Sequence, residues 1–283
     1  MSPVLQVPAK VGVLGGGRMG AGIAHAFLAS GASVTVVDIN EDAVAAARER
    51  VHKAIRGSLD RGAEGTFESW DERLSFCTAA SAFAGFDLVV EAVPESMDLK
   101  VAAFRDIADA APQAVVATNT SSLSVSQLAE SIPNDVIGLH FFNPVPASKL
   151  VEVVVAESTP EALVNTAKGW VEGLGKTAVV VKDAPGFASS RLGVAIALEA
   201  IRMVEEGVAS PRDIDNAMVL GYKFPIGPLE LTDIVGLDVR LGIAEYLESQ
   251  LGERFSPPQL MRDMVARGEL GRKSGKGFYD YSE

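Results

Sequence analysis

The chain has 283 residues, 48% hydrophobic and 22% charged, which is typical of a soluble globular protein with one large or two ordinary domains. Its formal net charge of −12 argues against nucleic acid or an anionic membrane as a partner. Cys77 is the one cysteine, the first eight residues do not resemble a signal peptide, and no apolar run is long enough to span a membrane. We therefore expect a cytoplasmic protein.

Residues 10–38 predict a strand, a glycine-rich turn, a helix and a second strand. The turn fits the G-x-G-x-x-G pattern, in which a pyrophosphate binds at a helix N-terminus. Asp38 follows at the distance where an acid hydrogen-bonds the ribose hydroxyls, and no cation for a 2′-phosphate stands in 39–41, so NAD is favoured over NADP. The expected cofactor contacts of this segment are Gly15, Gly17, Arg18, Met19, Gly20 and Asp38.

Strands and helices alternate along residues 10–183, which predicts an α/β fold of the Rossmann type with a doubly wound, mostly parallel sheet. Residues 61–72 predict a loop. After residue 183 only helices are expected: about 188–206, one that starts at Ser210, 229–250 and 257–267. We expect an NAD-binding domain over 1–183 and an all-helical domain over 184–283, which closes over the substrate and forms a dimer.

Several polar side chains follow the carboxyl ends of the predicted strands, where open parallel sheets bind ligands. They are Glu95, the segment 119–122 and His140, in addition to Asp38 and the glycine turn. His140 stands at such a strand end, and Glu152 lies in an apolar run twelve residues later. A buried carboxylate needs a partner, so we expect Glu152 to pair with His140.

A neutral imidazole accepts a hydroxyl proton near pH 7, and a carboxylate on its other nitrogen fixes the tautomer. Beside a nicotinamide, the pair of His140 and Glu152 predicts the oxidation of a secondary alcohol. Ser121 is expected to form a hydrogen bond with the substrate oxygen. No cluster of histidine and cysteine has the spacing of metal ligands, so we expect no metal. Arg50, Lys53 and Arg56 share one face of a helix, either as a solvated surface or, with Arg61, as a site for an anionic substrate group.

Nearly the whole chain resembles the 3-hydroxyacyl-CoA dehydrogenases. The resemblance rests on VGVLGGGRMGAGIA, DLVVEAVPE, NTSSLSV, GLHFFNPVPASKLVEVV, DAPGF and the tail GRKSGKGFY. It implies fatty-acid metabolism and the reversible oxidation of a short-chain L-3-hydroxyacyl-CoA, such as 3-hydroxybutyryl-CoA, with His140 as the base and Glu152 as its orienting acid. It further implies that Ser121 contacts the substrate and that Arg61 stands about where the family has a lysine that contacts CoA. Lys53, on the basic helix face, is expected to bind the substrate with Arg61. The implied additional NAD contacts are Glu95, Lys100, Asn119, Ser121, Asn143 and Lys273.

The chain departs from the family pattern at Ser190, where the family usually has a catalytic-site asparagine, and at Ala54, where it has a serine that contacts CoA. An asparagine amide reaches further than a hydroxyl, so substrate choice is expected to depend on Ser190. Two other readings stay open. The same chemistry could act on an acyl-carrier-protein thioester or a free hydroxy acid, or the chain could be a non-catalytic NAD sensor.

Overall fold

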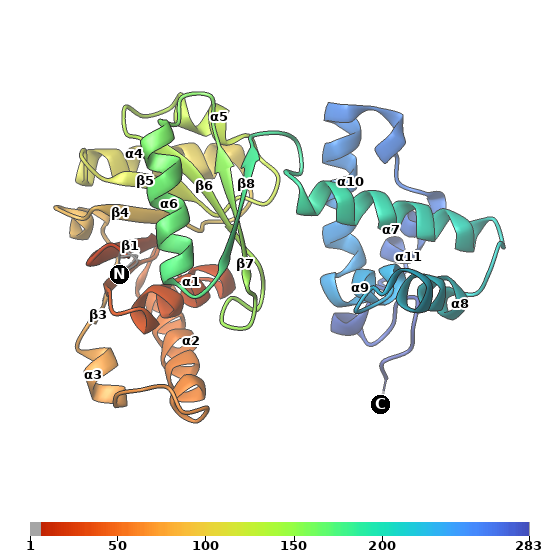
Figure 1. Cartoon of the computed structure of the whole chain (residues 1–283), viewed down its shortest axis with the longest axis horizontal. Helices are drawn as coiled ribbons and strands as arrows, with labels where there is room; N and C mark the ends of the chain where they lie inside the picture. The colour runs from red at the N-terminus through yellow and green to blue at the C-terminus, as the bar shows by residue number, and fades with distance from the viewer. Residues whose placement is uncertain (1–6, 283) are drawn as a thin grey trace. The chain divides into compact units, whose positions relative to one another are not determined.

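The computed structural model describes residues 7–282, so most of the N-terminal stretch in which no signal peptide is expected lies outside it. The chain divides into two compact units, Met1–Ala184 and Pro185–Glu283 (Figure 1). This division falls next to the boundary expected after residue 183. Within residues 7–282, no helix combines the length and the apolar composition that crossing a membrane requires.

The first unit is built on one eight-stranded sheet in the order β3-β2-β1-β4-β5-β6-β7-β8. Neighbouring strands are parallel except β6 and β7, which are antiparallel. This confirms the doubly wound, mostly parallel sheet. The strands are β1 Lys10–Leu14, β2 Ser33–Val37, β3 Leu74–Cys77, β4 Leu88–Glu91, β5 Val115–Thr118, β6 Val136–Phe141, β7 Leu150–Val155 and β8 Thr177–Lys182.

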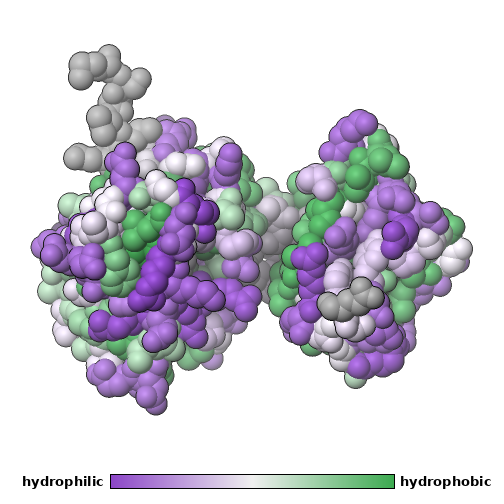
Figure 2. Space-filling model, turned by 90° about the horizontal axis from the view of Figure 1, so that it is seen from below, coloured by the Kyte–Doolittle hydropathy of each residue, from purple (hydrophilic) through white to green (hydrophobic). Residues whose placement is uncertain are grey.

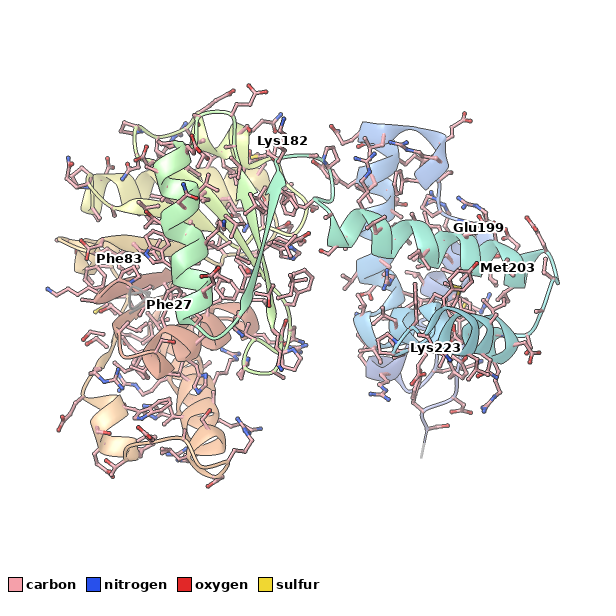
Figure 3. The ribbon with its side chains drawn as sticks, in the orientation of Figure 1. Phe27, Phe83, Lys182, Glu199, Met203 and Lys223 are labelled. Atoms are coloured by element: carbon pink, nitrogen blue, oxygen red, sulfur yellow. The ribbon has the colours of Figure 1, made fainter. Side chains whose placement is uncertain are left out.

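Side chains alternate along each strand, so the sheet has two apolar faces that helices cover. One face, which includes Val11 and Val13, packs on α1 (Arg18–Ala29), α2 (Glu41–Leu59) and α6 (Glu161–Gly173). α4 (Met97–Ala110) and α5 (Val125–Ala129) lie on the other face, with η1 (Ala80–Phe83) (Figure 1). Phe27 of α1 and Phe83 of η1, labelled in Figure 3, are both fully buried.

The structure differs from the sequence prediction in two segments. The expected loop 61–72 contains a short helix, α3 (Phe67–Asp71), which begins at a capping box between Thr66 and Ser69 and buries Trp70. Five residues are too few for a visible helical period. The expected helix 229–250 is two helices, because Gly236 adopts a left-handed φ of +105° that ends the first one.

The second unit is helical, as expected, with a core from buried side chains such as Leu198, Ile201 and Leu247. Its helices are α7 Ser189–Glu205, α8 Pro211–Asn216, α9 Pro228–Val235, α10 Leu237–Leu251 and α11 Gln259–Ala266, with short turns η2 Ala217–Gly221, η3 Glu253–Phe255 and η4 Arg272–Ser274. The buried Asp233 accepts hydrogen bonds from the backbone of Phe278 and Tyr279, which holds the C-terminal segment against α9.

His25 makes folding of the first unit sensitive to acid. The side chain is 4% exposed, bonded to Ser58 Oγ at 2.9 Å, and burial, with the charges of Arg61 and Lys176, lowers its pKa to about 4. As pH falls below about 6.5, the His25 imidazole takes up a proton in the unfolded chain before it does so in the folded chain. The stabilisation that is present above pH 6.5 is therefore lost as pH falls toward 4. The free energy of unfolding should drop by about 2 kcal/mol more between pH 7 and 5 in the wild type than in His25→Gln. Denaturant titrations at both pH values measure this difference, and equal drops would contradict it.

Candidate active site

The glycine turn connects β1 to α1, and the three glycines of the G-x-G-x-x-G pattern have different surroundings. Gly15 has φ +98°, and a Cβ there would lie 2.8 Å from the carbonyl carbon and oxygen of Ala92. A Cβ on Gly20 would lie 1.8 Å from the carbonyl oxygen of Gly15, so only glycine lets α1 pack this close. The Cβ position of Gly17 has no atom within 4 Å, which leaves open space in front of the helix. Arg18 and the partly buried Met19 form the first turn of α1.

The residues at this turn fit a dinucleotide. No side chain caps α1 at Gly17, so the N–H groups of its first turn are available to a phosphate. Asp38, just after β2, accepts the N–H of Gly16 at 2.7 Å and that of Ile39 at 2.7 Å. The carboxylate is thereby tied to the turn, with lone pairs left for ribose hydroxyls.

We predict that Asp38→Ala weakens NADH binding by about 10- to 100-fold, because hydrogen bonds to a charged group contribute about 1.5–3 kcal/mol. Fluorescence titration with NADH measures the Kd. Asp42→Ala is the matched control, since Asp42 is an exposed acid in the first turn of α2. Equal Kd values for the two variants would show that Asp38 does not contact the cofactor.

Glu95 organises the turn that follows β5. Its Oε1 accepts from the Thr120 hydroxyl at 2.7 Å, and from the N–H and hydroxyl of Ser121 at 2.9 and 3.1 Å. The N–H and hydroxyl of Ser122 each reach the same oxygen at 3.1 Å. Burial raises the pKa of Glu95, but the Lys100 charge and these hydrogen bonds outweigh it, so the net pKa is below the usual value. The carboxylate is therefore ionised and holds Ser121 at the end of the strand.

Lys100, expected as an NAD contact, lies inside the unit and is 1% exposed. Its ammonium is 2.7 Å from Glu91 Oε1 and 3.5 Å from Glu95 Oε2. Glu91 was not among the expected site residues, although it is an acid within an apolar run, the same signal that indicated Glu152. The same reasoning would have found it.

His140 and Glu152 stand directly opposite each other on the antiparallel strands β6 and β7. His140 Nδ1 is 2.8 Å from Glu152 Oε2, and the residues are 6% and 1% exposed. A carboxylate only accepts, so Nδ1 donates, and in the neutral ring Nε2 then carries a lone pair. The ring also lies 4.4 Å from that of Phe142. The structure thus brings together the pair that the sequence predicted.

Asn119 has a contact that the sequence did not indicate. Its Oδ1 accepts the N–H of Phe141 at 2.9 Å, one residue beyond His140. The side chain therefore braces the end of β6 against β5 and leaves its two amide protons for a ligand. Asn143, in the loop between β6 and β7, is exposed.

The cations on α2, and Arg61 just after it, lie in different surroundings. Arg50 donates to the carbonyl of Gly16 at 3.3 Å, so it supports the glycine turn. Arg56 stacks on the ring of Phe67 in α3 at 4.9 Å. Lys53 and Arg61 are exposed, and Arg61 also lies 3.4 Å from Ser58 Oγ. Exposed cations at these positions can take an anionic group from solvent.

Two expected site residues belong to the second unit. Ser190 lies in the first turn of α7 and is partly buried. Lys273 lies in η4, and its ammonium pairs with Asp238 Oδ2 at 2.6 Å. Among residues 7–282, no three histidine, cysteine, aspartate or glutamate side chains gather where they could hold a metal ion.

The parallel sheet, the glycine turn with Asp38, and the His140–Glu152 pair define an NAD-dependent oxidoreductase of the Rossmann type. Residues 10–184 match the NAD-binding domain of 3-hydroxyacyl-CoA dehydrogenase, and residues 186–281 match its C-terminal domain. The chain belongs to the 3-hydroxyacyl-CoA dehydrogenase family.

Individual proteins of known name are similar to this chain over almost its full length. A probable 3-hydroxybutyryl-CoA dehydrogenase of Bacillus subtilis is 40% identical, with 97% of this chain and 98% of the relative covered. The crystal structure of (S)-3-hydroxybutyryl-CoA dehydrogenase from Ralstonia eutropha has a TM-score of 0.92 at 36% identity, covering 98% of this chain and all of that one. A diketoreductase that acts on dicarbonyl compounds has a TM-score of 0.86 at 29% identity, covering 98% of this chain and all of that one.

Proposed function

We propose that the protein oxidises a short-chain L-3-hydroxyacyl-CoA, such as 3-hydroxybutyryl-CoA, to the 3-oxoacyl-CoA, and catalyses the reverse reduction, in fatty-acid metabolism. The observation that carries the proposal is the buried pair of His140 and Glu152 at the carboxyl edge of the sheet that bears the glycine turn. A binding protein that only senses NAD needs no such base. The 3-hydroxybutyryl-CoA dehydrogenases of similar sequence support the choice of substrate.

In this mechanism His140 Nε2 takes the proton of the substrate hydroxyl while the carbon gives up a hydride. The chemistry that NAD supplies when bound is acceptance of that hydride. Glu152 holds the Nδ1 proton, which keeps the ring in the competent tautomer and stabilises the imidazolium that forms. Ser121 binds the same substrate oxygen, and in the reverse direction His140 returns the proton.

The residues that would hold NAD are those of the glycine turn, where the uncapped helix end receives the pyrophosphate and Asp38 receives the ribose. Asn119 and Asn143 supply amide groups near the strand ends. Lys53 and Arg61 bind the phosphates of CoA.

Mixing the protein with acetoacetyl-CoA and NADH tests the proposal. We expect the reduced-nicotinamide absorbance to fall, and to fall far more slowly with free acetoacetate, because free acetoacetate lacks the CoA phosphates. No absorbance change with any thioester, diketone or hydroxy acid, together with tight NADH binding, would favour the sensor. A panel of thioesters of different chain length then defines acyl specificity.

A second candidate keeps the chemistry and changes the substrate to a small compound without CoA. It is favoured by the likeness to a diketoreductase that acts on dicarbonyl compounds. Faster turnover of a free diketone than of acetoacetyl-CoA would select it. An acyl-carrier-protein thioester is a third substrate to compare, because it presents the same acyl group on a protein.

We also propose that the protein is a cytoplasmic homodimer. The second unit exposes large apolar side chains, and Figure 2 shows hydrophobic residues at its surface. Four of them lie close together in the chain, on α9 and α10: Leu231, Ile234, Val235 and Val239, which are between 36% and 46% exposed. Exposed apolar side chains on two helices that contact each other are the kind of surface that a partner subunit covers. Sedimentation at the mass of one chain rather than two would refute the dimer.

A further inference from the structure

A buried ion pair lies beneath the turn that carries Ser121. Glu91, the last residue of β4, has no exposed surface, and Lys100 of α4 is 1% exposed. The carboxylate and the ammonium are 2.7 Å apart. Removing two charges from water is costly, and a buried pair often contributes little to stability compared with apolar side chains. The position of this pair next to the proposed site therefore requires a reason other than packing.

Glu91 ties together two strand ends. Its Oε2 accepts the hydroxyl of Thr118, the last residue of β5, at 2.6 Å, and its Oε1 accepts the N–H of Val93 at 2.7 Å. Burial is the largest influence and raises the pKa of Glu91 above its usual value, although Lys100 and these hydrogen bonds act to lower it. The ammonium of Lys100 and the N–H of Val93 both donate to Oε1, and an ionised carboxylate satisfies both donors. Glu91 is thus the counterion of Lys100.

Lys100 also reaches a second carboxylate, because its Nζ is 3.5 Å from Glu95 Oε2. The other oxygen of Glu95 accepts the N–H and the hydroxyl of Ser121. Both contacts end on one carboxylate oxygen, so Glu95 fixes the backbone and the side chain of Ser121 together. A continuous series of contacts therefore leads from Glu91 through Lys100 and Glu95 to Ser121.

We infer that Lys100 is a positioning residue that holds Glu95, and through it the Ser121 hydroxyl, with Glu91 as its buried counterion. The inference rests on the proposed function, because that function gives Ser121 its substrate contact. Glu95 is partly exposed, with 36% of its side chain accessible, so without the cation water would compete for its carboxylate. The Ser121 turn would then lose its fixed position, and a shift of about 1 Å at a reacting group costs up to about 100-fold in rate.

A double-mutant cycle tests the inference. Glu91→Gln with Lys100→Met removes both charges together, so no unpaired charge stays buried. We expect this paired replacement to lower kcat about 10-fold in the wild-type background, and less than about twofold when Ser121→Ala is already present. The Kd for NADH should stay within about twofold. Equal losses in both backgrounds would overturn the inference, as would a 10-fold weaker Kd, which would make Lys100 a cofactor contact.

Thermal unfolding shows whether the paired variant folds. If the paired variant does not fold, Glu95→Gln replaces it in the same cycle. Glutamine has the same shape as glutamate, and the Glu95 side chain is partly exposed, so this variant should fold. Its loss in kcat should likewise vanish in Ser121→Ala, and an additive result would overturn the inference. Failure of the proposed function looks different, since wild type would then be inactive on acetoacetyl-CoA or Ser121→Ala would match it. The inference alone fails if wild type is active, Ser121→Ala is impaired, and the losses in kcat from the two changes simply add.

Discussion

His140→Gln should lower kcat for acetoacetyl-CoA reduction by about 100- to 10,000-fold, the range that a general acid–base group contributes. Glutamine keeps a polar group beside Glu152 but cannot carry a proton to or from the substrate oxygen. NADH binding should stay within about twofold of wild type, because the hydrogen bonds that hold Asp38 are made by the N–H groups of Gly16 and Ile39. Steady-state kinetics and a fluorescence titration measure the two quantities.

His52→Gln is the matched control. His52 lies on α2, where its Nε2 is 2.8 Å from Asp71, and we place it outside the site. Turnover by this variant should equal that of wild type. If His140→Gln retained a comparable turnover, His140 would not be the base. If it lost NADH binding in proportion to its loss of kcat, the residue would be needed for cofactor binding instead.

Glu152→Gln should lower kcat by about 1,000-fold or more, the scale seen when the acid of a histidine–acid pair becomes an amide. The amide can donate a hydrogen bond to Nδ1, which moves the imidazole proton to Nε2, where it blocks acceptance of the substrate proton. It also leaves the forming imidazolium without its counter-charge. Because the side chain is 1% exposed, solvent cannot restore the lost interaction. Kinetics with saturating NADH measure the loss.

A second variant, Glu152→Asp, distinguishes the effect of the negative charge from the effect of side-chain length. It keeps the carboxylate on a side chain one methylene shorter, so turnover should recover part of the loss in Glu152→Gln. Thermal unfolding of all three proteins checks that each is folded. Equal turnover by Glu152→Asp and Glu152→Gln would show that the negative charge is not what His140 needs, and near-normal turnover by Glu152→Gln would remove Glu152 from the mechanism.

The local pattern of the chain was enough to predict several parts of the molecule. The glycine spacing followed by Asp38 predicted the strand–turn–helix–strand unit, because steric demands between a turn and its helix depend on adjacent residues. The apolar runs predicted the parallel sheet. The acid within one of those runs predicted the His140–Glu152 contact, since a buried carboxylate has to find a donor.

Other features were not readable from local pattern. The helix α3 was missed because its five residues are defined by a capping box rather than by a hydrophobic period. The brace from Asn119 to the N–H of Phe141 joins residues 22 positions apart, and only the pairing of β5 with β6 brings them together. The end of α9 depends on the backbone of Gly236, whose left-handed φ no hydrophobic pattern reveals.

The sequence by itself predicted the fold class, the cofactor and the contact between His140 and Glu152, because these follow from residue type, spacing and the cost of burying a charge. Only the tertiary structure decided how those residues are held. Lys100, which the family resemblance implied as a cofactor contact, is enclosed between Glu91 and Glu95, and the order β1-β4-β5-β6 places that network under Ser121. Burial is a property of the packed sheet and helices, so no stretch of chain reveals it alone.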